Sequence, residues 1–302
     1  MSQQRTIRVP VHFKGIGVHT GRCAHVALRP AAADTGIRFV RNDVGSGRLI
    51  GAHVDQVSDT LLATTLGPHG ESVSTVEHLL SALWGEAIDN VVVEVDGDEI
   101  PILDGSALPF VTSLRTAGFV DQDVPRRFLR ITRPVEVRSG DAFASLSPFP
   151  GFKASYTFVA DHPVYNRHPK RAAVDFADVD YLSSVGRARS FGLVEELPQA
   201  RALGRCLGSS LENAVGIGAE EILNPEGLRC DDEFVKHKIL DAIGDLYLLG
   251  APVVGAFEGY KSGHALNCAL ARAVLAQPGA FEIVTPARTV ASTKVRRARV
   301  SA

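Results

Sequence analysis

One helical pattern, residues 232–249, constrains the fold of this chain more than any other segment. Its apolar residues recur with the period of an α-helix and share one face, made of Val235, Ile239, Ala242, Ile243 and Leu246. His237, Asp241 and Asp245 follow at steps of four residues on roughly the opposite side. A helix this apolar is expected to be largely buried, so its acidic and imidazole groups need partners inside the protein. On a surface helix the same spacing would form only weak charge pairs.

A second helical pattern, residues 75–84, supplies polar groups of the same kind. Its apolar stripe consists of Val76, Leu79, Leu80 and Leu83. Glu77 and His78 are adjacent and lie off this stripe. A purely structural interpretation is also open, because Ser74 and Glu77 have the spacing of a helix capping box. His78 would then be an ordinary half-buried histidine.

The two helices together favour a metal site. Two imidazoles and one carboxylate, here His78, His237 and Asp241, are a known catalytic zinc ligand set that leaves a fourth position for water. Zinc lowers the pKa of bound water toward neutrality, and a neighbouring carboxylate can act as general base. Glu77 is placed for that role beside His78. Release of an amine also requires a proton donor, but the spacing of the histidines does not select one.

The remaining patterns indicate two mixed α and β regions. A chain of 302 residues favours two domains. Further helices are expected at residues 108–117 and 264–275, and less clearly at 181–187 and 191–203. Strand patterns cover residues 6–13, 23–28, 91–95, 128–137 and 142–146. The polar, proline-containing segment 121–127 is the expected domain linker.

Bulk composition excludes several classes of protein. The net charge of −2 gives no reason to expect nucleic acid as a partner. The four cysteines are scattered and form no C-x-x-C pair, which disfavours both a disulfide framework and a cysteine zinc site. The N-terminus lacks a signal-peptide core, and the longest apolar stretch, residues 246–257, is too short to cross a bilayer. A soluble cytoplasmic protein is therefore expected.

The end of the chain, residues 286–302, is basic. It carries Arg288, Lys294, Arg296, Arg297 and Arg299. A solvated tail is the simpler interpretation. The alternative is weak association with an anionic membrane surface, without stable insertion.

Several longer motifs resemble one known family. They begin with Gly15-Ile-Gly-Val-His-Thr-Gly21, Ser74-Thr-Val-Glu-His-Leu-Leu80, Ile88-Asp-Asn90 and Glu99-Ile-Pro-Ile-Leu-Asp-Gly-Ser106. They continue with Arg189-Ser-Phe-Gly192, Cys206-Leu-Gly-Ser209, Asn224-Pro-Glu-Gly-Leu-Arg229, His237-Lys-Ile-Leu-Asp-Ala-Ile-Gly-Asp245 and Lys261-Ser-Gly-His-Ala-Leu-Asn267. With these motifs in this order, the chain resembles the UDP-3-O-acyl-N-acetylglucosamine deacetylase family. These are the zinc amidases of lipid A biosynthesis in Gram-negative bacteria.

The resemblance implies a set of catalytic roles. It implies one Zn²⁺ ion, with Fe²⁺ as a cellular alternative, held by His78, His237 and Asp241. Glu77 would be the general base and His264 the general acid, with Asp245 orienting His264. Lys238 and Lys261 would contact the anionic nucleotide end of the substrate. Phe191 would pack beside the sugar or acyl chain. Ser190 stands where the family usually has threonine, and its hydroxyl could still donate to the developing oxyanion.

The resemblance also implies the fold and the reaction. The expected fold is α+β, with two similar two-layer domains at residues 1–123 and 128–285, each a β-sheet with a helical layer, and the active site between them. Residues 190–222 would form an apolar passage for the acyl chain, although their leucines could equally belong to a core helix. The expected reaction removes the N-acetyl group from UDP-3-O-acyl-N-acetylglucosamine, the committed step of lipid A biosynthesis, in a monomer whose partner is this small molecule. The alternatives are a zinc amidohydrolase for another acylated amino sugar and a non-catalytic sugar-nucleotide binding protein.

Overall fold

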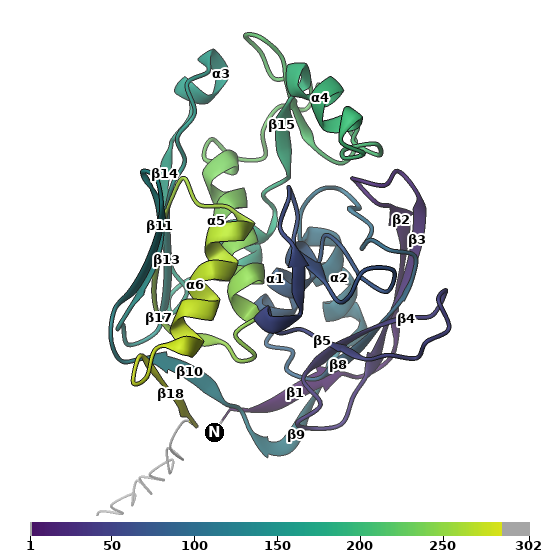
Figure 1. Cartoon of the computed structure of the whole chain (residues 1–302), viewed down its shortest axis with the longest axis vertical. Helices are drawn as coiled ribbons and strands as arrows, with labels where there is room; N and C mark the ends of the chain where they lie inside the picture. Colours follow the sequence, from purple (N-terminus) through teal and green to yellow (C-terminus); the bar gives the residue numbers. More distant parts are fainter. Residues whose placement is uncertain (1, 286–302) are drawn as a thin grey trace, which may run out of the picture.

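Two β-sheets face each other across two layers of helices in the computed structural model, which describes residues 2–285 (Figure 1). The sheet nearer the N-terminus has the strand order β2-β3-β8-β4-β5. Its strands are β2 (Val11–Ile16), β3 (Cys23–Pro30), β8 (Val91–Asp96), β4 (Ile37–Arg41) and β5 (Ile50–Gly51). In the centre, β8 pairs antiparallel with β3 and parallel with β4. Val91, Val93 and Val95 are fully buried, which confirms the buried strand expected there.

The second sheet is built around β17 (Val253–Tyr260). Its main path runs β11-β12-β17-β10-β18, and β13 joins it through β17 with β14 beyond. The other strands are β10 (Phe128–Ile131), β11 (Val135–Ser139), β12 (Ala142–Ser147), β13 (Phe152–Thr157), β14 (Arg171–Asp175) and β18 (Phe281–Val284). The expected strand at residues 128–137 is thus two strands, because Pro134 cannot donate to a ladder.

The helices fill the space between the sheets. In Figure 1, α1 (Glu77–Gly85) and α2 (Leu108–Ala117) lie on the side of the first sheet, and α5 (Glu233–Tyr247) and α6 (His264–Ala276) on the side of the second. Two short helices, α3 (Pro163–Asn166) and α4 (Leu197–Ala202), lie at one end. Most buried apolar residues of both halves form one continuous cluster, and a smaller separate cluster contains Val164, Tyr165, Val215, Ile217 and Phe234. The α+β architecture with sheets and helical layers is as expected.

The central helices match their predicted ranges closely. All residues of α5 except Lys236 and Lys238 are buried, so its polar groups face the protein interior as inferred. The interpretation of Ser74 and Glu77 as a capping box at the start of α1 is wrong. Thr75 has a left-handed backbone with φ of 58°, which a capping box does not allow, and no side chain caps the helix. The Glu77 carboxylate is therefore available for another purpose.

Three small sheets complete the structure. They pair β1 (Gln3–Ile7) with β9 (Phe119–Pro125), β6 (Val57–Asp59) with β7 (Thr65–Leu66), and β15 (Phe191–Leu193) with β16 (Val215–Ile217). The expected linker at 121–127 is therefore mostly strand. The weaker helical patterns are confirmed in part: residues 182–186 form a short π-helix, and residues 191–203 begin with β15 but continue as a 3-10 turn and α4.

Two of the expectations from the sequence concern membranes. Within residues 2–285, no helix combines the length and the apolar character that a membrane crossing requires. The basic tail at residues 286–302 lies outside the described residues.

Gly244 allows α5 to approach the start of α1 very closely. A Cβ atom at this position would lie 2.0 Å from the carbonyl oxygen of Glu77 and 2.7 Å from its carbonyl carbon. Both are backbone atoms, so no flexible side chain can move aside. The glycine therefore sets how near Glu77 and His78 come to the polar side of α5.

We expect Gly244→Ala to destabilise the protein, although alanine is the better helix former. Helix propensity alone would stabilise by about 1 kcal/mol, whereas an extra carbon in a packed contact costs about 1–3 kcal/mol. Urea unfolding followed by circular dichroism measures the resulting change in the free energy of unfolding. Gly151→Ala is the control, because its added carbon would make ordinary contacts with two Phe149 ring atoms, at 3.6 and 4.0 Å. A higher unfolding midpoint for Gly244→Ala would contradict the tight contact.

Candidate metal centre and its pocket

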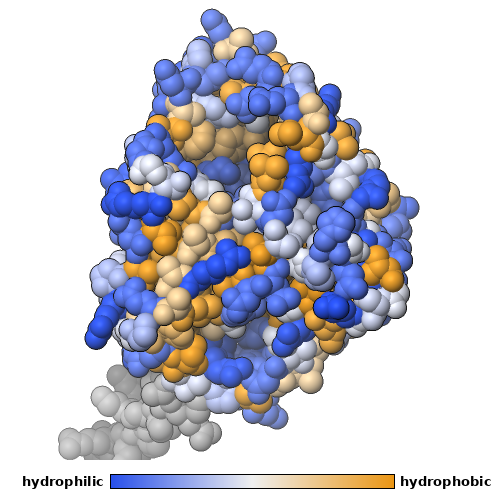
Figure 2. Space-filling model, in the orientation of Figure 1, coloured by the Kyte–Doolittle hydropathy of each residue, from blue (hydrophilic) through white to orange (hydrophobic). Residues whose placement is uncertain are grey.

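A pocket of about 610 Å³ opens beside the starts of α1, α5 and α6. One end is polar and is lined by Glu77, His78, His237, Asp241 and His264. The other end is apolar and is lined mainly by residues around β15, β16 and α4, among them Val194, Leu197, Leu211, Val215 and Leu223. In Figure 2 the surface is hollowed in the upper part of this face, with apolar side chains around the hollow. The cavity thus has one charged end and one apolar end.

Two imidazoles and a carboxylate meet where α1 passes α5. The candidate ligand atoms of His78, His237 and Asp241 lie within 4.8 Å of one another, and all three side chains are buried. The Nε2 atoms of His78 and His237 lie 3.4 and 3.3 Å from Oδ1 of Asp241. The two rings are nearly perpendicular, at 89°. The three groups expected from two separate helices are therefore brought together.

The hydrogen bonding of this cluster fits a divalent cation. Nδ1 of His237 lies 3.1 Å from the carbonyl oxygen of Ala188. The carbonyl can only accept, so Nδ1 carries the proton and Nε2 is left as a free electron-pair donor. Oδ1 of Asp241 is buried and, among residues 2–285, has no hydrogen-bond partner. A buried carboxylate oxygen without a partner is costly, and a bound cation would satisfy it.

The charge states of the ligand groups also suit a cation. Burial lowers the pKa of His237 to about 3, so its imidazole is neutral at physiological pH. Burial opposes ionisation of Asp241, but adjacent positive charge, including the Lys238 ammonium, holds the pKa of Asp241 well below its usual range. Nζ of Lys238 donates to Oδ2 of Asp241 at 2.8 Å, which leaves Oδ1 free. Neutral imidazole and ionised carboxylate are the forms that bind metals.

Glu77 lies beside the cluster without belonging to it. Its Oε2 accepts a hydrogen bond from the backbone N–H of Thr64 at 3.0 Å. Its Oε1 lies 3.7 Å from Nε2 of His264. Burial raises the pKa of Glu77, and the positive charge of His264 opposes that rise. A raised pKa makes this carboxylate, next to a candidate metal position, a better proton acceptor than an ordinary glutamate.

His264 begins α6 and faces Glu77 from the other side of the pocket. Its Nδ1 is 2.9 Å from Oδ2 of Asp245. Burial disfavours the imidazolium, but the carboxylates of Asp245 and Glu77 outweigh burial and raise the pKa of His264 to about 10. His264 is therefore protonated at neutral pH and can donate a proton.

Asp245 is fully buried and fixes its surroundings through three hydrogen bonds. Besides His264, its Oδ2 accepts from Nδ2 of Asn267 at 2.9 Å, and its Oδ1 accepts from Oγ1 of Thr64 at 2.6 Å. Thr64 thus bonds to both Glu77 and Asp245 and links the two carboxylates. Sequence reasoning missed Thr64 because it follows no helical or strand pattern, and it gave no role to Asn267 even though that residue lies in the helix expected at 264–275. Asn267 does lie within the motif that contains His264.

The expected substrate-binding residues are only partly brought together. Ser190, Phe191 and Lys238 line the pocket. Nζ of Lys238 also lies 5.6 Å from the centre of the Phe191 ring. Lys261 does not line the pocket and instead pairs with Asp141 on the surface.

His19 is a pocket residue that received no role from the sequence. It is buried and lines the cavity near Cys206, whose backbone N–H lies 3.3 Å from Nδ1 of His19. His19 is part of the glycine-rich motif at residues 15–21, which was the one indication of it in the sequence. The pattern alone does not distinguish a turn residue from a pocket residue.

The apolar end of the pocket corresponds to the expected insert at residues 190–222. Val194, Leu197 and Leu211 line the cavity, and Leu203 and Leu207 do not; of these five residues only Leu197 is not exposed. No residue of α4 is buried. The alternative of a core helix in this segment is therefore wrong.

Comparison with known proteins points to one family. The family model LpxC, described as UDP-3-O-acyl N-acetylglycosamine deacetylase, matches residues 4–276. A UDP-3-O-acyl-N-acetylglucosamine deacetylase of Acidithiobacillus ferrooxidans is 48% identical over 284 residues, which cover 94% of this chain and 93% of that protein. A protein of the same name from Thioalkalivibrio sulfidiphilus is 49% identical over 285 residues, which cover 94% of each chain.

Proposed function

The chain belongs to the UDP-3-O-acyl N-acetylglycosamine deacetylase family, and we propose that it removes the N-acetyl group from UDP-3-O-acyl-N-acetylglucosamine. The products are acetate and UDP-3-O-acyl-glucosamine, and the reaction is the committed step of lipid A biosynthesis. As a member of a deacetylase family, the chain is a hydrolase of an amide bond. One observation carries the proposal: a single pocket joins a ligand-like cluster, a buried carboxylate and a protonated histidine to an apolar end.

His78, His237 and Asp241 are the proposed ligands of one Zn²⁺ ion, and Fe²⁺ suits the same donor set. When bound, such an ion polarises the amide carbonyl and makes a water molecule more acidic. The free Oδ1 of Asp241 and the neutral Nε2 of His237 support this assignment.

The proton transfers are assigned to two buried groups. Glu77 accepts the proton of the attacking water, for which its raised pKa is suited. The water oxygen forms a bond to the acetyl carbon, and the bond from that carbon to nitrogen then breaks. His264 gives its proton to the departing amine, while Asp245 holds the imidazole ring in place. Ser190, in the pocket wall, is assigned to hydrogen-bond the developing oxyanion.

The ends of the substrate are assigned by their chemistry. The apolar end of the pocket would take the O-acyl chain, with Phe191 beside the sugar or the start of that chain. Lys238 and Lys261 are assigned to the anionic nucleotide. Lys261 would have to exchange Asp141 for the substrate.

The setting of the reaction is also part of the proposal. The four cysteines are unpaired, which suits a reducing compartment, and we place the enzyme in the cytoplasm. Every proposed catalytic group comes from one chain, so a monomer suffices.

The test is acetate release from purified protein and UDP-3-O-acyl-N-acetylglucosamine. We expect release that stops with a zinc chelator and returns when Zn²⁺ is added. Substrate binding without acetate release would support a non-catalytic sugar-nucleotide binding protein instead. Equal rates with an analogue lacking the acyl chain would point to a different amino sugar, because the apolar end would then have no use.

A further inference from the structure

Glu233 is a fully buried carboxylate at the start of α5, one helical turn before His237. It does not line the pocket, yet it accepts four hydrogen bonds. Three come from Arg189, through its backbone N–H at 3.0 Å, Nε at 2.9 Å and Nη2 at 3.2 Å. The fourth comes from the backbone N–H of Arg229 at 2.6 Å. The carboxylate thus ties a distant chain segment to the first turn of the helix.

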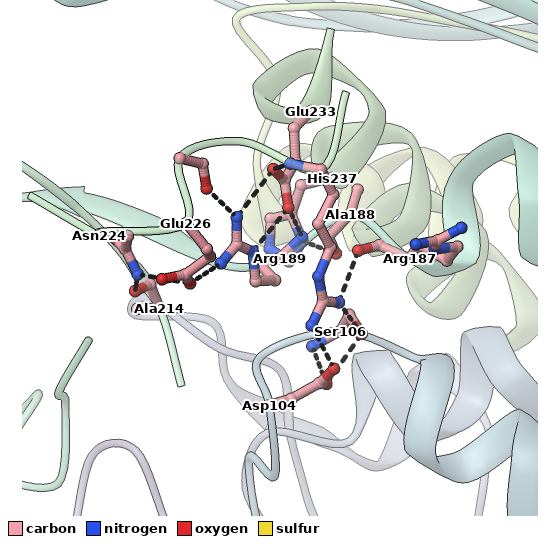
Figure 3. Close-up of polar contacts among 12 residues, drawn as sticks. Asp104, Ser106, Arg187, Ala188, Arg189, Ala214, Asn224, Glu226, Glu233 and His237 are labelled. Carbon is pink, nitrogen blue, oxygen red and sulfur yellow. Dashed lines mark hydrogen bonds and ion pairs between the residues drawn. The ribbon is translucent and has the colours of Figure 1, made fainter. Parts of the chain in front are cut away.

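Arg189 is equally well held. Only 4% of the residue is exposed, and its guanidinium lies between Glu233 and Glu226 (Figure 3). Nη1 donates to Glu226 at 2.6 Å, and Nη2 also donates to the carbonyl oxygen of Gly227 at 2.7 Å. All three nitrogens of the fork therefore have partners. The planar geometry of arginine makes such a multiple contact rigid.

The residue before Arg189 touches the metal cluster. The carbonyl oxygen of Ala188 accepts the proton of His237 Nδ1, as Figure 3 shows. Among residues 2–285 this is the only hydrogen bond of the His237 side chain, and the other ring nitrogen faces Asp241. Since Glu233 and His237 lie on the same helix, the Arg189–Glu233 pair sets the distance between the Ala188 carbonyl and the imidazole.

The same segment is also tied to the first half of the chain. The guanidinium of Arg229 donates to Asp104 at 2.8 Å, to Oγ of Ser106 at 3.1 Å and to the carbonyl oxygen of Arg187 at 2.9 Å. The backbone N–H of Ser190 donates to the carbonyl oxygen of Gly105 at 2.8 Å. Residues 187–190 are thus held on both sides, with Ala188 between the anchors.

We propose that Arg189 and Glu233 are positioning residues for the metal site: their buried ion pair holds the Ala188 carbonyl on Nδ1 of His237 and so fixes the tautomer and the ring orientation of this ligand. The inference rests on the proposed role of His237 as a metal ligand. Neither residue lines the substrate pocket, so neither contacts the substrate directly. A buried ion pair is weak evidence for stability, because apolar groups of the same size often stabilise as well. Control of the geometry of His237 accounts for a buried ion pair at this point of the fold.

The experiment measures metal affinity in Glu233→Gln and Arg189→Lys. Glutamine keeps the size of Glu233 but loses its charge, and lysine keeps the charge of Arg189 but loses the fork. Loss of a ligand's hydrogen-bond partner typically lowers metal affinity about 10–100-fold. We expect a loss of that size for Zn²⁺ in chelator competition. We also expect a changed visible spectrum of the Co²⁺-substituted protein, which reports ligand geometry directly.

Asp89→Asn is the matched control. It weakens another largely buried ion pair, with Arg126, which lies beyond the far end of α1. We expect lower thermal stability but unchanged Zn²⁺ affinity and an unchanged Co²⁺ spectrum in this variant. If Glu233→Gln and Arg189→Lys behave like the control, the pair is only structural and the inference is overturned. If wild-type protein itself fails to bind Zn²⁺, the proposed metal site fails instead.

Discussion

Replacing Asp241 by alanine is expected to remove the metal from the protein and, with it, nearly all activity. Asp241 supplies the only anionic donor of the proposed ligand set, and its Oδ1 is the atom toward which both imidazoles point. Two neutral imidazoles alone bind a divalent cation far more weakly. We expect metal content to fall from about one ion per chain to nearly none. Turnover should fall at least about a thousandfold, because several kcal/mol of charge stabilisation are lost.

Metal analysis and acetate release on the same preparation measure both effects. Asp232→Ala is the control, because it removes a partly exposed carboxylate at the start of the same helix. Asp232 pairs with Lys236, a contact expected to contribute about 0–1 kcal/mol. That variant should keep its metal and its rate. An Asp241→Ala protein that retains one metal ion would show that the ligand set is wrong.

Glu77→Gln is expected to separate chemistry from metal binding. Glutamine keeps the shape of the side chain and an oxygen for the N–H of Thr64, but it cannot take a proton from water. General base catalysis contributes about 10²–10⁴-fold. We therefore expect kcat to fall by that factor while metal content and KM stay close to the wild-type values.

Steady-state kinetics and metal analysis test this result together. Glu86→Gln is the matched control, because Glu86 is a buried carboxylate just beyond the other end of α1, where it pairs with Arg115. It should leave kcat unchanged. Loss of metal from Glu77→Gln would make Glu77 a ligand, and an unchanged kcat would remove it from the mechanism.

The central helices were predictable because their patterns are long and their burial decides their conformation. Residues 232–249 and 108–117 have apolar stripes that only a helix can bury, and α5 and α2 lie there. The start of α1 was mispredicted for a tertiary reason. Oγ1 of Thr75 donates to Glu99 at 3.0 Å, a contact that helps hold Thr75 in a conformation no local pattern would choose.

The candidate site was predictable only where its residues lie on those helices. His237, Asp241 and Asp245 share one face of α5, so their spacing was informative. Thr64 carries no such signal, because its partner Asp245 is 181 residues away along the chain. The same holds for Arg189 and Glu233, which are 44 residues apart. Contacts of this kind depend on the whole fold rather than on a local pattern.

The packing of α1 against α5 also has a consequence for how the protein is made. His78 is synthesised long before His237, and the contact that joins their helices at Gly244 needs both halves of the chain. Closing so long a loop is slow, and its entropy cost is offset only when the helices pack. All strands of the first sheet lie within residues 11–96, whereas His78 cannot meet His237 and Asp241 until residue 241 has been synthesised. Assembly of the proposed ligand set is therefore a late step in synthesis, possible only after both α1 and α5 have been made.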